Sequence, residues 1–190
     1  MPHSIFATTF LVLWGGWLVY WIASSRKVKA TRWRESIGSH LIHTLPLSLS
    51  FVLLAMHRNL PEILLQRFMP HSLVAAIVSL AMTAAGLGIA VWARWRLGRN
   101  WSGNVTVKED HTLVRSGPYR IVRHPIYSGL LLAVAGTALA IGQWRGVLAL
   151  ALALLALTLK ARTEERVMRG VFPDYERYRR ESWALIPFLY

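Results

Sequence analysis

The chain has 190 residues, of which 54% are hydrophobic and only 16% are charged, and its formal net charge is +13. This length suits one domain, so residues 1–190 are expected to form a single integral membrane domain. The absence of cysteine excludes disulfide bonds and thiolate metal sites. No nucleic-acid partner is expected, because the basic residues are distributed by membrane side rather than gathered on one helix face.

Long apolar stretches recur along the sequence. Residues 5–23, 37–56 and 72–92 contain no Asp, Glu, Lys or Arg. A stretch of about 18 or more apolar residues is long enough to cross the hydrocarbon core of a bilayer. Two shorter apolar stretches, 126–142 and 146–159, are separated by only three residues and predict a helical hairpin. The sequence therefore predicts an all-α, polytopic membrane protein with about five transmembrane helices.

The basic residues indicate how these spans are oriented. Five spans would leave segments 24–36, 93–125 and 160–190 on one side, and these segments carry 19 of the 22 Lys and Arg residues. Basic residues collect on the cytoplasmic side of membrane proteins. We therefore expect the N-terminus outside and the C-terminus in the cytoplasm, with membrane lipids around the spans.

Two pairs of residues inside the second and third apolar stretches could suggest ligand sites. His40 and His43 could bind a metal, but no carboxylate or further histidine accompanies them in that stretch. Hydrogen bonding between helices or proximity to the interface is the favoured interpretation, and no metal site is predicted. Gly86 and Gly88 follow no strand, so close helix packing accounts for them better than a dinucleotide fingerprint does.

The segment 94–125 is rich in Gly, Asn, Pro and β-branched residues and predicts a cytoplasmic loop with short turns. A loop of about 30 residues is unusually long for a compact protein and is usually functional. Pro125 can occupy the first turn of the next helix, which places His124 at its start, beside Arg123 and Tyr127. Unpaired N–H groups at a helix N-terminus favour an anion, so this position would suit a carboxylate or a phosphate.

The segment 160–190 is predicted to continue the last span as an amphipathic helix. Arg162 and Glu165 share one face of it, and Glu164 lies on the adjoining face. Two adjacent acids at the end of a span are costly unless they are paired, and Arg123 and Arg162 are the candidate partners. The alternative is a solvated helix turn with ordinary surface ion pairs.

The pattern H-x-L-V-x-x-G-P-Y-x-x-x-R-H-P-x-Y-x-G over residues 111–129, followed by R-x-E-E at 162–165, resembles the isoprenylcysteine carboxyl methyltransferase family. These are integral membrane enzymes that use S-adenosylmethionine (SAM). The resemblance extends over residues 97–188 and includes a Phe-Pro turn at 172–173 and a closing Ile-Pro-Phe at 186–188. One departure is the Phe-Pro turn itself, because many members have an F-G-x-x-Y turn that is one residue longer.

The resemblance implies a role for each half of the chain and for individual residues. Residues 1–93 would supply three N-terminal spans and residues 94–190 the catalytic core. Arg123 and Glu165 would be catalytic, and Arg162 would bind substrate. The residues implied to hold SAM are His111, Leu113, Val114, Gly117, Tyr119, His124, Pro125, Tyr127 and Glu164.

The implied reaction fits the chemistry of these side chains. The carboxylate of SAM could bind at the helix terminus with Arg and His, while tyrosine faces and Glu165 stabilise the sulfonium. Methyl transfer to an ionised carboxylate needs no base, and alignment alone can contribute about 7–11 kcal/mol. Arg123 could orient the carboxylate with two hydrogen bonds. An amine or thiol acceptor would need Glu165 or His124 as the base.

We therefore expect SAM-dependent methyl transfer to a lipophilic acceptor, with the carboxylate of an isoprenylcysteine-like or other lipid as the first candidate. The short chain resembles the prokaryotic branch of the family, which implies the cytoplasmic (inner) membrane and an active site that faces the cytoplasm. One alternative is an NADPH-dependent reductase of the sterol-reductase type, which has a similar H-P-x-Y-x-G element. Another is a non-enzymatic small membrane protein in which the motif is an interfacial anchor. The sequence defines neither the acceptor nor the oligomeric state.

Overall fold

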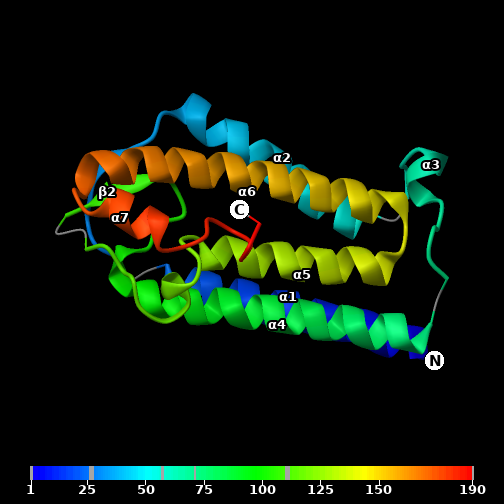
Figure 1. Ribbon diagram of the computed structural model, residues 1–190. Helices are drawn as coiled ribbons and strands as arrows, with labels where there is room; N and C mark the ends of the chain where they lie inside the picture. Colours follow the sequence, from blue (N-terminus) through cyan, green and yellow to red (C-terminus); the bar gives the residue numbers. More distant parts are fainter. Residues whose placement is uncertain (1, 26–27, 57, 71, 110–111, 190) are drawn as a thin grey trace.

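The structure is a computed structural model that describes residues 2–25, 28–56, 58–70, 72–109 and 112–189. Its long helices lie side by side, and its short elements gather mainly at one end of the bundle (Figure 1). The elements in chain order are α1 (Pro2–Ser24), β1 (Thr31–Arg34), α2 (Ile37–Ala55), α3 (Glu62–Leu65), α4 (Leu73–Leu97), η1 (Gly98–Asn100), β2 (Thr106–Lys108), η2 (Gly117–Arg120), α5 (Pro125–Ile141), α6 (Trp144–Val171) and α7 (Tyr175–Arg180).

Four helices in the described part of the chain are long and apolar enough to cross a membrane. They contain the spans Phe6–Ser24, Ile37–Ala55, Leu73–Asn100 and Trp144–Val171, and α5 is a fifth, shorter apolar helix. The expected hairpin of α5 and α6 is present, and its turn is made by Gly142 at a φ of 60°. Glycine adopts this left-handed conformation without steric cost. The side of the membrane on which each loop lies stays a prediction.

The all-α prediction is wrong in one respect, because β1 and β2 form a small antiparallel sheet. Trp33 is opposite Val107, and Arg34 is opposite Thr106. The segment 94–125, which contains β2, was expected to be a loop with short turns. Threonine, valine and tryptophan favour strands when a partner strand is available, but the partner here is about 70 residues away. A local sequence pattern does not reveal such a pairing.

Helices α4 and α5 pack with their backbones in contact. A Cβ atom added to Gly86 would lie 2.5 Å from the carbonyl oxygen of Gly129, and one added to Gly129 would lie 2.5 Å from the carbonyl oxygen of Gly86. A Cβ atom on Gly88 would meet no heavy atom within 4 Å. The predicted role in helix packing is therefore confirmed for Gly86 and wrong for Gly88, which lies on another face of α4.

Helix α6 runs without interruption through the last apolar stretch and onward to Val171. The predicted continuation of the last span as a helix is therefore confirmed as far as Val171 and wrong beyond it, because α7 covers only Tyr175–Arg180 and residues 181–189 form turns and bends. Phe172 and Pro173 end the helix, since proline lacks the N–H that a helix interior needs. After α7 the chain turns back toward α5, where Val122 and Trp183 form a parallel bridge. This return, drawn in red in Figure 1, brings residues 182–185 to the start of α5.

Candidate active site

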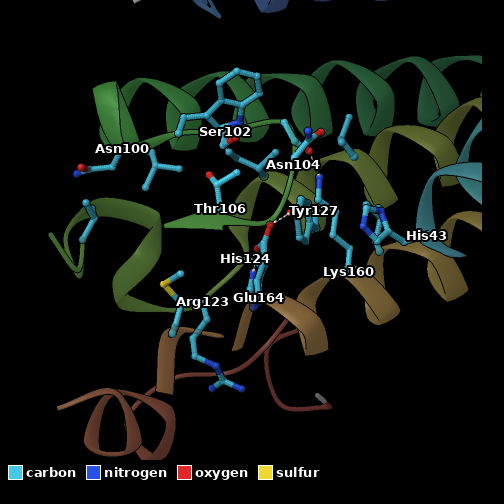
Figure 2. Close-up of a pocket in the computed structure, with 18 of the residues that line it drawn as sticks. His43, Asn100, Ser102, Asn104, Thr106, Arg123, His124, Tyr127, Lys160 and Glu164 are labelled. Atoms are coloured by element: carbon cyan, nitrogen blue, oxygen red, sulfur yellow. Dashed lines mark hydrogen bonds and ion pairs between the residues drawn. The ribbon is translucent and has the colours of Figure 1, made fainter. Parts of the chain in front are cut away.

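A cavity of about 350 Å³ lies between the long helices and the short elements at the end of the bundle. Its volume is in the range of small-molecule sites, roughly 300–1,000 Å³. One part has an apolar lining, made by Trp17, Trp21, Leu47, Phe51, Leu130 and Leu157. The other part has a polar lining, made by Asn100, Asn104, Thr106, Arg123, His124, Tyr127, Lys160 and Glu164 (Figure 2). One cavity can therefore receive an apolar chain and a charged group together.

His124 is the residue that precedes α5, and two acids of α6 hold its side chain. Its Nδ1 lies 3.3 Å from Glu164 Oε2, and its Nε2 lies 3.4 Å from Glu165 Oε1. Burial by itself lowers the pKa of His124, but the contacts with Glu164 and Glu165 outweigh burial and raise this pKa above 6.5. These contacts therefore favour the imidazolium form of His124 more than water does in a free histidine.

Tyr127 completes this arrangement from the first turn of α5. Its ring stacks on the His124 ring with the centroids 5.4 Å apart. Its hydroxyl donates a hydrogen bond of 2.5 Å to Glu164 Oε1, the contact drawn as a dashed line in Figure 2. The three side chains form a connected group, in which Glu164 links a tyrosine hydroxyl and an imidazole.

Arg123 points away from this group toward the C-terminal segment (Figure 2). Its Nε donates a hydrogen bond of 2.6 Å to Glu165 Oε1, and its Nη1 donates to the carbonyl oxygens of Arg179 and Ser182. The Arg123 and Glu165 side chains are only 8% and 9% exposed. Glu165 Oε2 also lies 3.3 Å from Arg179 Nε. The ion pair therefore fastens the C-terminal segment to α5 and α6.

The start of α5 differs from the open anion site that the sequence suggested. The N–H groups of Arg123 and His124 donate to the carbonyl oxygens of Trp183 and Ala184, at 2.8 and 3.1 Å. The N–H of Tyr127 donates to the carbonyl oxygen of His124. The C-terminal segment thus occupies donors that a sequence pattern alone leaves free for a ligand.

The structure separates the residues predicted to bind ligands into two groups. Those that line the cavity are Arg123, Leu113, Val114, Tyr119, His124, Tyr127 and Glu164. Gly117, Pro125, Glu165 and Arg162 are outside the described lining. Gly117 has a positive φ, and Pro125 occupies the first position of α5, so both shape the backbone. Arg162 is exposed. His111 lies outside the described residues.

Sequence reasoning missed the polar lining contributed by residues 100–106. Asn100 Oδ1 and Thr106 Oγ1 are buried without a hydrogen-bond partner, as is Trp17 Nε1 from α1. All three residues line the cavity. Because buried polar atoms are normally hydrogen-bonded, these atoms are candidates to contact a ligand. The polar run N-W-S-G-N at 100–104 is the signal that could have identified this segment.

Sequence reasoning also missed Glu35. No carboxylate lies within the apolar stretch that holds His40 and His43, but Glu35 just before it reaches both: its Oε1 lies 3.4 Å from His40 Nδ1 and 3.2 Å from His43 Nε2. Burial by itself raises the pKa of Glu35, but hydrogen bonds from the Val105 N–H and the Ser39 hydroxyl, together with the contact to the His43 ring, lower it overall. Glu35 is therefore ionised at neutral pH.

Comparison with known proteins gives a family match. Residues 74–175, more than half of the chain, match the family model described as phospholipid methyltransferase. The matched region begins in α4 and ends at Tyr175, so it includes the His124, Tyr127 and Glu164 group and the loop that lines the cavity.

Three curated relatives illustrate the range of similar proteins. The cobalt-zinc-cadmium resistance protein CzcN of Cupriavidus metallidurans is 35% identical over 116 residues, 58% of this chain and 50% of that protein. The protein-S-isoprenylcysteine O-methyltransferase of Schizosaccharomyces pombe is 32% identical over 130 residues, 63% of this chain and 55% of that protein. A probable protein-S-isoprenylcysteine O-methyltransferase of Oryza sativa subsp. indica is 30% identical over 147 residues, 75% of each chain. The chain thus matches about half the length of the first two relatives.

Proposed function

Since the chain belongs to the phospholipid methyltransferase family and is itself similar in sequence to isoprenylcysteine O-methyltransferases, we propose that it transfers a methyl group from SAM to a lipophilic acceptor. The observation that carries this proposal is the single cavity with an apolar lining at one part and the His124, Tyr127 and Glu164 group at the other. Such a cavity suits one charged, soluble reactant and one apolar reactant.

The polar lining fits the chemical groups of SAM. When bound, SAM supplies an electrophilic methyl group on a sulfonium ion. The ring of Tyr127 and the carboxylate of Glu164 can stabilise a cation in a partly dry site. Asn100 Oδ1 can accept a hydrogen bond, and Thr106 Oγ1 can accept or donate one. These residues therefore provide both the negative charge and the unpaired polar atoms that SAM requires.

One arginine and one lysine line the described cavity, and their partners differ. Arg123 is paired with the carboxylate of Glu165, whereas Lys160 Nζ donates to the neutral carbonyl oxygen of Gly103 at 2.6 Å. A carbonyl carries no net charge, so only Glu164, in the same lining, offsets the ammonium charge of Lys160. We therefore assign Lys160 the attraction of an anionic ligand group. Arg123 and Glu165 are positioning residues, which hold the C-terminal segment against the site.

The acceptor proposed first is the carboxylate of an S-prenylated cysteine or a similar lipid. Such a carboxylate is already ionised at neutral pH, so its oxygen can attack the methyl carbon directly while the bond from that carbon to sulfur breaks. The products are a methyl ester and S-adenosylhomocysteine. No proton is transferred, and the contribution of the protein is alignment of the two reactants and exclusion of water.

The proposed location follows from the charge distribution. The segments that carry 19 of the 22 basic residues also supply the loop and the end of α6 that form the polar lining. Basic segments favour the cytoplasmic side. We infer that the protein lies in the cytoplasmic membrane with its N-terminus outside. The polar part of the cavity would then open to the cytoplasm, from which SAM would enter.

The first test is calorimetric titration of the detergent-purified chain with S-adenosylhomocysteine. Wild type is expected to bind at micromolar concentration, and His124→Ala to bind at least tenfold more weakly. Arg166→Ala is the control, because this exposed residue of the same helix as Glu164 lies outside the cavity lining. Absence of binding in a sample with a normal melting temperature would refute the proposal. A shift of that temperature by NADPH would favour the reductase instead.

The second test addresses the acceptor. Transfer of labelled methyl from SAM is compared for an S-prenylated cysteine with a free carboxylate and for the same molecule as a carboxamide. Label is expected only with the free carboxylate, as a base-labile ester. Equal labelling of the carboxamide would show that the carboxylate is not the acceptor.

A further inference from the structure

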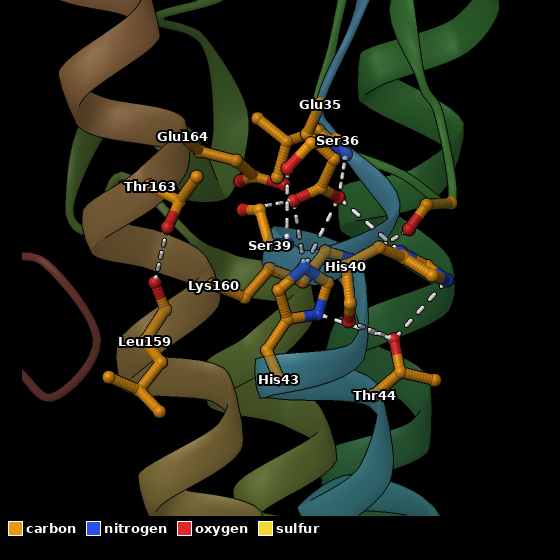
Figure 3. Close-up of polar contacts among 12 residues, drawn as sticks. Glu35, Ser36, Ser39, His40, His43, Thr44, Leu159, Lys160, Thr163 and Glu164 are labelled. Carbon is orange, nitrogen blue, oxygen red and sulfur yellow. Dashed lines mark hydrogen bonds and ion pairs between the residues drawn. The ribbon is translucent and has the colours of Figure 1, made fainter.

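Glu35, His40 and His43 form a compact cluster that the proposed methyl transfer does not use (Figure 3). Glu35 lies between β1 and α2, and the two histidines lie in the first two turns of α2. The side chains of Glu35 and His43 are 2% and 4% exposed, and that of His40 is 34% exposed. One carboxylate and two imidazoles therefore meet in a mostly buried position, with one imidazole accessible to solvent.

We propose that this cluster binds a divalent transition-metal ion of the zinc class. His40 Nδ1 and His43 Nε2 lie 3.4 and 3.2 Å from the same oxygen of Glu35, and one ligand atom from each residue lies within 4.8 Å of the others. Donors on one tetrahedral ion with bonds of about 2.0–2.1 Å are roughly 3.3–3.4 Å apart. Two imidazole nitrogens and one carboxylate oxygen are a donor set that suits zinc.

Thr44 supports the assignment, because its hydroxyl faces the other nitrogen of each ring. The hydroxyl donates to the carbonyl oxygen of His40 at 2.7 Å, so its oxygen remains an acceptor. His40 Nε2 and His43 Nδ1 lie 3.3 and 3.5 Å from that oxygen. A histidine that binds a metal usually donates its second N–H to such an acceptor, which fixes the tautomer. Neutral rings in this tautomer direct two lone pairs at Glu35, an arrangement that a cation between them stabilises.

Two further hydrogen bonds hold the carboxylate of Glu35 in place. The N–H of Val105 donates to Oε1 at 3.0 Å, and the hydroxyl of Ser39 donates to Oε2 at 2.8 Å. Hydrogen bonds of this kind orient a ligating carboxylate. Because Val105 lies directly before β2, the metal ion would also join the β1–β2 sheet to α2.

The coordination would be incomplete on the side of the cavity. His40, His43 and Thr44 all belong to the cavity lining. Three protein ligands with a fourth position open to a cavity are typical of zinc that binds a ligand, whereas structural zinc has four protein ligands. The fourth position would take a water molecule or a small anion. Lys160 lines the same cavity and opposes a cation, but Glu164 in the same lining offsets that charge.

The test uses the full chain in detergent, purified without a histidine tag, stripped with a chelator and titrated with Co²⁺. Tetrahedral Co²⁺ absorbs visible light strongly, so the spectrum reports the geometry of the site. One equivalent of Co²⁺ is expected to bind and to be displaced by Zn²⁺. His43→Ala and His40→Gln are each expected to weaken binding at least a hundredfold. If the variant of the buried His43 does not fold, His40→Gln still tests the site, because the His40 side chain is partly exposed.

Thr44→Val and Thr163→Val form a matched pair for the same titration. The Thr163 hydroxyl bonds to the carbonyl oxygen four residues earlier, at 3.0 Å from Leu159, as the Thr44 hydroxyl does to His40, and both bonds are drawn in Figure 3. Only the Thr44 hydroxyl faces the two imidazoles within the described cluster. Thr44→Val is expected to weaken Co²⁺ binding roughly 10–100-fold, and Thr163→Val to leave it unchanged.

Two results would overturn the inference. One is the absence of stoichiometric Co²⁺ binding by a chain with a normal melting temperature, which would show that protons on the histidines satisfy Glu35. The other is binding that survives both histidine substitutions. Titration of the same samples with S-adenosylhomocysteine keeps this result separate from the proposed methyl transfer, since binding of that ligand by metal-free chain would leave the methyltransferase proposal intact.

Discussion

The contact between α4 and α5 can be tested with two glycines of the same helix. In Gly86→Ala the new methyl group would lie 2.5 Å from the backbone nitrogen of Ala133 and 2.5 Å from the carbonyl oxygen of Gly129. Both atoms belong to the backbone of α5, so no side-chain rotation relieves the clash. In Gly88→Ala the methyl group meets no heavy atom within 4 Å. The two variants therefore make the same chemical change with opposite steric consequences.

The magnitude follows from the distance that the helices must move. Ordinary contact begins at 3.4 Å, whereas the clash is at 2.5 Å, so α4 and α5 must separate by roughly 1 Å. Overpacking of this kind costs about 1–3 kcal/mol. Separation also weakens the hydrogen bond of 3.3 Å from Thr83 Oγ1 to the carbonyl oxygen of Ala133, worth about 1 kcal/mol. The higher helix propensity of alanine offsets up to about 1 kcal/mol of this destabilisation.

We therefore expect Gly86→Ala to lower the free energy of unfolding by about 1–3 kcal/mol. Gly88→Ala is expected to leave it unchanged or to raise it by up to about 1 kcal/mol. The assay is reversible unfolding in mixed micelles, followed by the fluorescence of the nine tryptophans. Equal stability of the two variants would refute the backbone contact between α4 and α5.

Three further predictions concern buried charges. Glu165→Gln leaves the buried Arg123 without its carboxylate and is expected to lower the free energy of unfolding by about 3 kcal/mol. The exposed Glu176→Gln is the control. Equally small changes in both variants would contradict the role of Glu165 in holding the C-terminal segment. The raised pKa of His124 means that the folded state binds its proton more tightly. The stabilisation from His124 is therefore fully present below about pH 6.5 and is lost as the pH rises through the pKa of the folded state. The melting temperature of wild type should exceed that of His124→Gln most at low pH. A difference in melting temperature that grows with pH would show that the pKa of His124 is lowered by folding. Arg145 Nη1 donates to carbonyl oxygens at the C-terminal end of α2, including that of Leu53 at 2.9 Å. Arg145→Met should therefore lower the free energy of unfolding by about 1.5–3 kcal/mol. The control Arg58→Met, at an exposed position, should leave it unchanged.

The sequence was sufficient for features that depend on local composition. The thickness of a bilayer requires long apolar helices, so the apolar stretches predicted the spans and the hairpin. The motif around His124, together with Glu164 on the last helix, predicted the group that lines the polar part of the cavity. Both features follow from spacing along one segment or from a pattern that the family shares.

Features that depend on two distant segments required the tertiary structure. Glu35 is five and eight positions from His40 and His43, outside the apolar stretch that holds them, and only the turn before α2 brings the three together. Helical spacing places Gly86 and Gly88 on different faces, but only the position of α5 decides which face is packed. Backbone donors at the start of α5 are available to a ligand or occupied according to where residues 182–185 lie. Local periodicity and composition determine the long helices, whereas tertiary packing decides which strands pair, which polar atoms meet and which remain open to the cavity.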